Sequence, residues 1–290
     1  MFDFRYHVAS LAAVFIALVV GMLVGAGISG RGLLDETERA RLNARIAQLE
    51  DDVRHERRHA SELIAAAELA DAAHVALLEG RLREKRVAVV FLGSVDGSIR
   101  GAVEQTVALA GGRIIRLGAL RMPIASTSVE AELRRRPALH GYLDPLRTED
   151  LGRDLGREFV EGGDMPLLRA LDDPLVEEQG PLASDPADAV VVCRTARPQD
   201  GQTASFLNGV YAGVAGAGVP AVGVETSTVS RSAIEVYRRS GLSSVDDVDL
   251  QVGRVALAVL LAGGPAGHYG VKPTASAAVP PIDPVPPADE

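Results

Sequence analysis

The sequence predicts an α/β protein: an N-terminal transmembrane helix and a long coiled-coil helix, followed by a small three-layer domain built on a parallel sheet. Three observations predict it: an uncharged apolar stretch near the amino terminus, a heptad repeat after it, and short apolar runs that alternate with helical patterns from residue 87 onward. The predicted parts are a short tail (1–7), the transmembrane helix (8–28), the coiled-coil helix (33–84), the α/β domain (87–270) and a proline-rich, disordered tail (271–290).

Composition narrows the class of protein. Hydrophobic residues make up 47% of the 290 residues, aromatic residues only 4%, and tryptophan is absent, so the core of the domain must be aliphatic. The net charge of −9 argues against nucleic acid as a partner, because nucleic-acid-binding proteins usually present a basic face. The single cysteine, Cys193, excludes an internal disulfide framework and a cysteine-rich metal centre.

The stretch at 8–28 is uncharged and has the length of a membrane span. A helix of this length measures about 31 Å, and the hydrocarbon core of a bilayer is about 30 Å thick. The apolar regions of signal peptides are usually shorter, about 7–15 residues, so the length favours a retained single-pass anchor. Cleavage near the small residues Gly25 and Gly27 remains the alternative.

Small residues recur along the predicted anchor. Ala9, Ala13, Ala17, Gly21 and Gly25 are spaced four apart and would form one smooth stripe on a helix. Such stripes let two membrane helices approach closely, which predicts a dimer, although alanine and glycine are also common in membrane helices generally.

The orientation of the anchor follows from two opposing indications. Several arginines follow the stretch and only Arg5 precedes it, which would keep the rest of the chain in the cytoplasm. Long domains are nevertheless translocated largely regardless of charge. Because a single early apolar segment usually acts as an export signal, we expect the globular domain on the extracytoplasmic side, in the cell envelope.

A heptad seam follows the anchor and predicts a parallel coiled-coil dimer. The seam positions alternate in steps of four and three, and most are apolar: Leu42, Ile46, Leu49, Val53, Glu56, Ala60, Leu63, Ala67, Ala70, His74 and Leu77. A helix that folds back on its own globular domain is the alternative. Together with the stripe, the predicted homodimer interface consists of Ala13, Ala17, Gly21, Gly25, Ile46, Leu49, Val53 and Leu63.

Two histidines, His55 and His59, lie four residues apart within RHERRHA. This spacing can place two imidazoles on one metal ion. The pair falls outside the seam and beside three arginines whose charge opposes a cation, so the sequence favours an exposed polar face here.

The α/β domain is predicted from strands at 87–92, 113–118, 188–193 and 219–225, which are short and apolar, and from helices between them. The predicted helices cover 99–110, 203–216, 230–240 and 250–262, the last capped by Asp249 or a nearby aspartate. Residues 122–163 are more polar and mostly helical, and the acidic stretch 172–188 is predicted to be an exposed loop.

No catalytic motif stands out, so we do not expect an enzyme. The glycines after the first strand lack the dinucleotide and P-loop patterns, and Asp96 at that strand's end is interpreted as a turn residue. No resident cofactor is predicted. The metal-ligand candidates are Cys193, because thiolates suit Cu(I), and His268, although a buried cysteine and a structural histidine are the simpler interpretations.

Two stretches carry a resemblance to a known family: HVASLAAVFIALVVGMLVGAG at the amino terminus and SSVDDVDLQVGRVALAVLLAGGPAGHYG at 243–270. They resemble the actinobacterial copper transport protein family named for the mycobacterial copper transporter B. The resemblance covers most of the chain and is weakest from about 122 to 188. It implies a membrane protein of copper efflux or homeostasis at the cell envelope, with the copper ion as cargo, but it carries over no ligand residue.

The residues themselves add a constraint and an alternative. A single apolar helix with an alanine and glycine stripe cannot line a water-filled channel, so transport would require partners or an oligomer. The alternative is a dimeric envelope scaffold that does not transport, whose exported domain binds a second envelope protein of the cell wall or division machinery.

Overall fold

The computed structural model describes the backbone of residues 4–29 and 36–284, and side chains at 10–26 and 38–284. The chain divides into two compact units, Met1–Glu68 and Leu69–Glu290. The first unit contains α1 (Phe4–Ser29) and most of α2 (Glu36–Leu78), which runs on into the second. α2 thus contains most of the predicted coiled-coil helix (33–84) in one element of 43 residues.

Among the residues that the structure describes, no helix is both long enough and apolar enough to cross a membrane. The predicted transmembrane segment (8–28) has a described backbone throughout, but its side chains are described only at 10–26.

The second unit is an α/β domain whose described strands form a seven-stranded sheet in the order β3-β2-β1-β4-β5-β6-β7. All neighbouring strands are parallel except β3, which runs antiparallel to β2 at the edge. The strands are β1 (Arg86–Leu92), β2 (Arg113–Leu120), β3 (Val176–Leu182), β4 (Ala189–Arg194), β5 (Ala221–Val224), β6 (Ser243–Val245) and β7 (His268–Tyr269).

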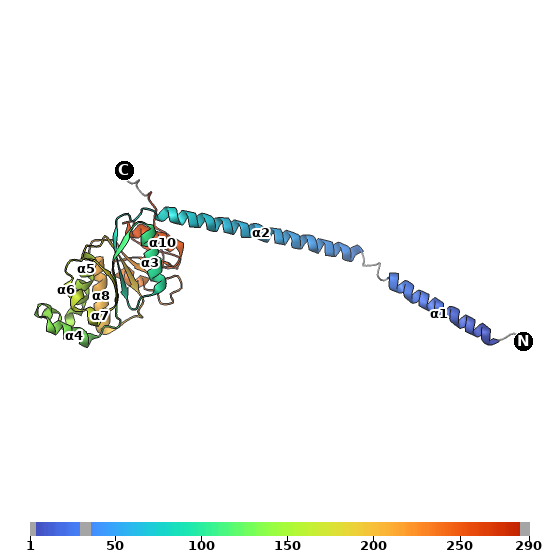
Figure 1. Ribbon diagram of the computed structural model, residues 1–290, viewed down its shortest axis with the longest axis horizontal. Coiled ribbons are helices and arrows are strands. Elements are labelled where there is room, and N and C mark those ends of the chain that lie inside the picture. The colour runs from blue at the N-terminus through green and yellow to red at the C-terminus, as the bar shows by residue number, and fades with distance from the viewer. Residues whose placement is uncertain (1–3, 30–35, 285–290) are drawn as a thin grey trace. The chain divides into compact units, whose positions relative to one another are not determined.

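Helices cover both faces of this sheet, which confirms the predicted α/β class and its layered domain (Figure 1). One face carries α3 (Gly97–Leu109) and α10 (Gln251–Leu261), together with Leu78 and Leu82. The other face carries α4 (Ser126–Arg135), α5 (Thr148–Glu161), α6 (Pro166–Ala170), α7 (Asp172–Leu175), α8 (Gly201–Ala215) and α9 (Ile234–Arg239). Two short 3₁₀ helices, η1 (Pro137–Tyr142) and η2 (Pro145–Arg147), connect α4 to α5.

The central strands are buried on both faces, as their uninterrupted apolar runs predict. In β1, Ala88, Val90 and Leu92 point to the α5–α8 side, whereas Val87, Val89 and Phe91 point to the α3–α10 side. This alternation is the period of two that a strand imposes on its side chains. The four predicted strands correspond to β1, β2, β4 and β5.

Helices α5 and α8 pack against each other at glycines. A Cβ added to Gly152 would lie 2.0 Å from the Phe206 carbonyl oxygen, and one added to Gly209 would lie 2.0 Å from that of Glu149. Gly156 and Gly213 show the same close approach one turn further along. Each helix therefore requires residues without a side chain where the two helices cross. Each supplies two glycines spaced four residues apart.

The acidic stretch at 172–188 differs from the predicted exposed loop, since it forms α7 and the edge strand β3. Besides its pairing with β2, this stretch is held by Arg116 of β2, which is fully buried. The guanidinium group donates to the carbonyls of Ala183 and Asp185 in this stretch, and to those of Phe159 and Val160 at the end of α5. Cations are favoured at the carboxyl end of a helix, so Arg116 links α5 to the strand connection.

The last part of the domain also differs from the sequence prediction. Residues 243–250 contain the short strand β6, and Asp249 does not cap α10; Leu250 occupies the N-cap position and makes no side-chain capping bond. Asp249 instead accepts hydrogen bonds from the Ser227 amide and hydroxyl, each at 2.6 Å.

The tail was predicted to be disordered over 271–290, and residues 285–290 lie outside the described residues. Residues 271–284, in contrast, contact the domain: Ala277 forms an isolated bridge with Tyr269, and Val279 and Ile282 pack against the core on the α3–α10 face. The prolines of this segment reduce its own hydrogen bonding but do not prevent it from docking.

Candidate functional site

Cys193, the first predicted metal ligand, lies at the end of β4 and is fully buried. Burial, reinforced by the negative charge of Asp96, raises the pKa of its thiol far above the usual range. Because the thiolate is the form that binds metal ions, this environment disfavours Cys193 as a ligand and suits a packing residue of the core.

His268, the second predicted ligand, begins β7 and is half-buried. Its Nδ1 atom lies 2.9 Å from the Ser244 hydroxyl on the neighbouring strand. Burial lowers the pKa of the imidazole, and the charge of Arg238 lowers it further. The ring is therefore mostly neutral and is held by a hydrogen bond within the sheet.

The sheet register keeps the two predicted ligands apart. Cys193 aligns with Val224 of β5, Val224 with Val245 of β6, and Val245 with Tyr269 of β7. Cys193 on β4 and His268 on β7 are therefore three strand spacings apart, a distance of roughly 14 Å across the sheet. In the part of the chain that the structure describes, no three His, Cys, Asp or Glu side chains are positioned to hold a metal ion.

Parallel sheets bind ligands where the strand order reverses, at the carboxyl ends of the strands. Here that point lies between β1 and β4, and it is closed by direct packing. A Cβ on Gly93, which has a φ of +119°, would lie 2.5 Å from the Ala196 amide nitrogen. The Thr195 hydroxyl donates to the Ser94 carbonyl at 2.6 Å and joins the two loops.

Asp96 is used to cap the helix that follows β1. Its carboxylate accepts hydrogen bonds from the Ser98 hydroxyl at 2.6 Å, the Ser98 amide at 2.9 Å and the Ile99 amide at 3.1 Å. These bonds, the Ser98 hydroxyl first among them, lower the pKa of the carboxyl group. The interpretation of Asp96 as a turn residue agrees with this geometry.

A basic pocket of about 400 Å³ lies beside the carboxyl ends of β4 and β5. Its lining includes three arginines, Arg194, Arg197 and Arg231. The Arg194 guanidinium donates to the carbonyls of Arg231 and Ser232 at 3.4 and 3.3 Å, which fixes it to the pocket wall. Three guanidinium groups around one pocket favour anions and disfavour a free metal cation.

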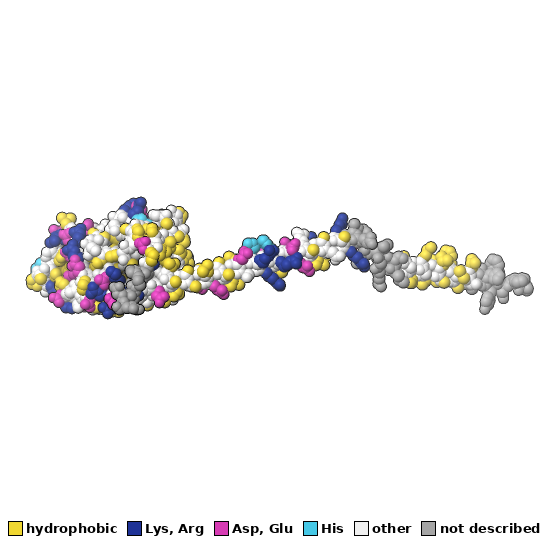
Figure 2. Space-filling view, turned by 90° about the horizontal axis from the view of Figure 1, so that it is seen from above, with side chains coloured by type: hydrophobic (Ala, Val, Ile, Leu, Met, Phe, Trp, Pro, Cys, Tyr) yellow, Lys and Arg dark blue, Asp and Glu magenta, His cyan; other side chains and the backbone are white. Residues whose placement is uncertain are grey.

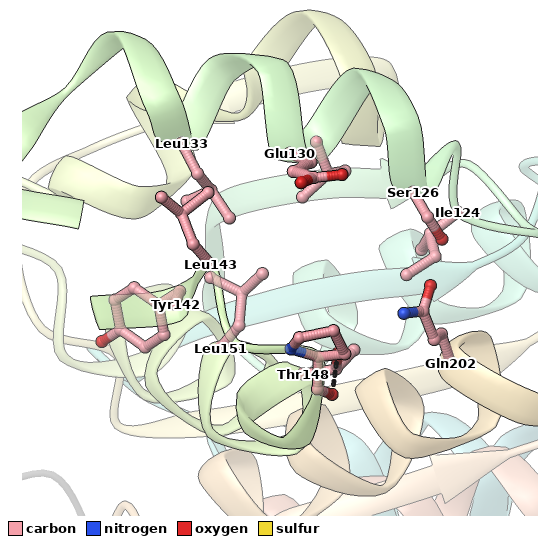
Figure 3. Close-up of a pocket in the computed structure, with 11 residues that line it drawn as sticks. Ile124, Ser126, Glu130, Leu133, Tyr142, Leu143, Thr148, Leu151 and Gln202 are labelled. Carbon is pink, nitrogen blue, oxygen red and sulfur yellow. Dashed lines mark hydrogen bonds between the residues drawn. The ribbon is translucent and has the colours of Figure 1, made fainter. Parts of the chain in front are cut away.

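A second pocket, of about 100 Å³, lies between α4, η1, η2 and α5. Figure 3 shows Leu133, Tyr142 and Leu143 on one side of this space and Ile124, Ser126 and Gln202 on the other. The lining supplies oxygen and amide groups but no sulfur or imidazole, so its chemistry does not suit copper.

Sequence reasoning missed a group of buried carboxylates at the carboxyl ends of β5 and β6. Glu225, Asp246 and Asp247 are all at most 4% exposed, and Lys272 from the tail is the cation beside them. Asp246 accepts hydrogen bonds from the amides of Val271 and Lys272, and Glu225 accepts one from the Ala233 amide at 2.7 Å. Asp246 and Asp247 lie in the acidic run SSVDDVDL, which the sequence predicts as the segment that leads into the last helix.

Asp247 differs from its neighbours. Neither of its carboxylate oxygens has a hydrogen-bond partner among the described residues. Burial raises its pKa to about 7, and the charges of Asp246 and Asp249 act in the same direction, opposed by Lys272. Asp247 is thus the one member of the group whose charge the fold does not compensate with a direct contact.

The predicted dimer interface lies in the first unit and is exposed in the single chain. On α2, the side chains of Ile46, Leu49, Val53 and Leu63 are 52%, 56%, 47% and 70% exposed. On α1, Ala13 and Ala17 are exposed, and a Cβ added to Gly21 or Gly25 would meet nothing within 4 Å. These surfaces are therefore free in the isolated chain to contact a second copy.

Comparison with known proteins supplies the context for these observations. The model of the family described as "Copper transport outer membrane protein, MctB" matches residues 1–280. Proteins named Copper transporter MctB from Mycobacterium bovis and from two strains of Mycobacterium tuberculosis are each 26% identical over 309 aligned residues, which cover 93% of this chain and 96% of theirs. The match confirms the resemblance predicted from the sequence. The chain belongs to the MctB family of copper transport proteins.

Proposed function

We propose that this protein acts in copper efflux or homeostasis at the cell envelope, as a membrane-anchored parallel dimer with no enzymatic activity. The single observation that carries the copper role is the family match over residues 1–280. It extends across both structural units, so the proposal concerns the whole chain and not an isolated domain. The family match does not favour the alternative of a scaffold without a transport role.

The proposed anchor is α1. Its described side chains, at 10–26, are uncharged and exposed, and the helix of 26 residues would extend about 39 Å. A surface of this kind is stable in a bilayer and unfavourable in water. We place the second unit on the extracytoplasmic side, because a single early apolar segment usually acts as an export signal and long domains are translocated largely regardless of flanking charge.

The proposed dimer pairs the α2 helices along the seam that contains Ile46, Leu49 and Val53. These apolar side chains recur at heptad spacing and lie about half exposed in the single chain. Burying each one in a partner would contribute about 1–2 kcal/mol. The stripe on α1 would hold the same two chains together and raise the effective concentration of the α2 helices.

Copper handling by this dimer does not use the core of the α/β domain. Cys193 is buried and protonated, and the sheet register separates it from His268 by three strand spacings. The proposed role therefore relies on exposed donors of the chain or on a partner protein.

Growth of cells in the presence of copper tests this function. A strain without the protein should become sensitive to copper and regain tolerance when the full chain is restored. Tolerance to zinc should remain unchanged, since a general defect of the envelope would affect both metals. Equal copper tolerance with and without the chain would contradict the proposed role.

A further inference from the structure

Two histidines on α2, which the sequence assigned to an exposed polar face, are close enough to share one ligand. His55 and His59 lie one helical turn apart, where side chains at positions i and i+4 are neighbours. Both are exposed, with His59 61% accessible, and Figure 2 shows histidine side chains on the surface of the long helix beside basic and acidic ones. Neither residue belongs to the heptad seam.

The two imidazole rings approach each other with their Nε2 atoms. Their Nε2 atoms are 3.1 Å apart, and the rings stand nearly perpendicular, at 84°. Imidazole nitrogens bind ions such as Zn²⁺ at about 2.0–2.1 Å, so two nitrogens on one ion lie 3.1 Å apart when the angle at the ion is roughly 100°. This angle lies between the tetragonal and tetrahedral arrangements of first-row metals, so the ion needs only small adjustments of the two rings.

The charges around the pair are more favourable to a cation than the sequence suggested. The Arg54 guanidinium is paired with Asp51 at 2.6 Å, and the segment 51–62 contains four acidic residues against three arginines. Glu62 lies 3.8 Å from Nδ1 of His59, the ring nitrogen that does not face His55. A carboxylate hydrogen-bonded to the second nitrogen is the usual support of a metal-bound histidine, and Glu62 lies just beyond hydrogen-bond distance of this nitrogen.

We propose that His55 and His59 form a two-histidine surface site for a divalent transition-metal ion, with water completing the coordination. Divalent copper is the ion of choice, because nitrogen sites bind Cu²⁺ most tightly among the first-row divalent ions. The site rests on the geometry of the pair, and only its physiological role rests on the proposed function in copper transport. It provides exposed nitrogen donors, which the buried Cys193 and the bonded His268 do not.

Titration of the purified, detergent-solubilised full chain with CuCl₂ tests the site, with binding followed by calorimetry and by the nitrogen coupling in the electron paramagnetic resonance spectrum of Cu²⁺. The wild type should bind one tight equivalent per chain, with two nitrogen ligands. His55→Ala and His59→Ala should each weaken that equivalent at least about tenfold, because losing one arm removes the chelate advantage. The matched control is His140→Ala, which removes an exposed histidine outside the pair and should leave the affinity unchanged.

A spacing variant makes the test sharper. His59→Ala combined with Arg57→His keeps the number of histidines but places them two residues apart, on different sides of the helix. This double variant should bind Cu²⁺ as weakly as His59→Ala does, even though it lacks the positive charge of Arg57, which opposes the binding of a cation. Helix content, measured by circular dichroism, should not change in any of these variants.

Undiminished affinity in the two alanine variants, or in the spacing variant, would overturn the site. This failure is distinguishable from failure of the proposed function, which is assessed by the copper tolerance of cells carrying the wild-type chain.

Discussion

Nζ of Lys272 lies 2.6 Å from Oε1 of Glu225, with the two side chains only 15% and 5% exposed. The same ammonium group donates to the Thr226 carbonyl at 2.9 Å. The contact joins the proline-containing tail to the end of β5 across 47 residues of sequence. A buried ion pair therefore helps to hold the tail on the domain, together with the bridge from Ala277 to Tyr269.

Removing the cation of this pair should destabilise the domain. Lys272→Met leaves Glu225 buried beside Asp246 and Asp247 without a counter-ion, and breaking a buried pair from one side typically costs about 3–5 kcal/mol. Chemical denaturation should show the loss, and limited proteolysis should cut the tail more rapidly. The control is Lys85→Met, which removes the only other lysine of the sequence. Equal stability of the two variants would refute the role assigned to Lys272.

Asp247 should make stability depend on pH. Its pKa is about 7 in the folded domain against an ordinary value of 3.8, so the folded state holds the proton more tightly. The stabilising effect of the protonated form is complete below about pH 4 and is lost as the pH rises through about 7. Asp247→Asn should remove this fall and raise the free energy of unfolding at pH 8 by about 2–4 kcal/mol.

Denaturation curves of the wild type and Asp247→Asn between pH 5 and pH 8 measure this difference. The exposed Asp164, changed to Asn in the same way, serves as the matched control and should leave the pH profile unaltered. Parallel profiles for the wild type and Asp247→Asn would show that the Asp247 carboxyl group is not protonated in the folded domain.

The α2 seam should be sensitive to charge. Ile46→Glu places like charges opposite each other at a seam position and should convert the dimer largely to monomer. Ala47→Glu adds the same charge one residue away, on the outer surface of the helix, and should have little effect. Light scattering of the detergent-solubilised full chain gives the mass of each variant, and equal masses for Ile46→Glu and Ala47→Glu would argue against pairing through this seam.

The glycine stripe of α1 should contribute to the same association. Gly21→Ile fills the surface across which two helices would approach, and it should weaken self-association of the membrane segment. Val20→Ile changes a neighbouring residue outside the stripe and should not. A reporter of helix association in membranes compares the two variants directly; if Gly21→Ile associates like the wild type, the stripe is not an interface.

Local patterns predicted much of the fold. The continuous apolar runs led to β1, β2, β4 and β5, because strands buried on both faces leave this signature in any sequence. The edge strand β3 was not predictable in this way, since its residues are acidic and mostly exposed. The strand pairs with β2, and the segment after it accepts hydrogen bonds from Arg116, a distant residue whose buried side chain no local pattern indicates.

The candidate sites were harder to predict, because they depend on distances between segments. Cys193 and His268 are of the right chemical types, but only the strand order shows that they lie too far apart. Asp246 and Asp247 were visible as a run of acids, yet only the structure shows that they are buried near Glu225 and its partner Lys272 from the tail. The approach of His55 to His59 follows from helical spacing, whereas the pairing of Arg54 with Asp51 became apparent only in the structure.

The rate at which copper-loaded cells lose the ion is the most direct measure of a role in copper transport. Cells are loaded with copper, transferred to copper-free medium and sampled over time for cell-associated metal, with and without the protein. Cells without it should lose copper more slowly and retain more, and restoring the full chain should return the rate to normal. Identical rates of copper loss in the two strains would contradict the proposed function.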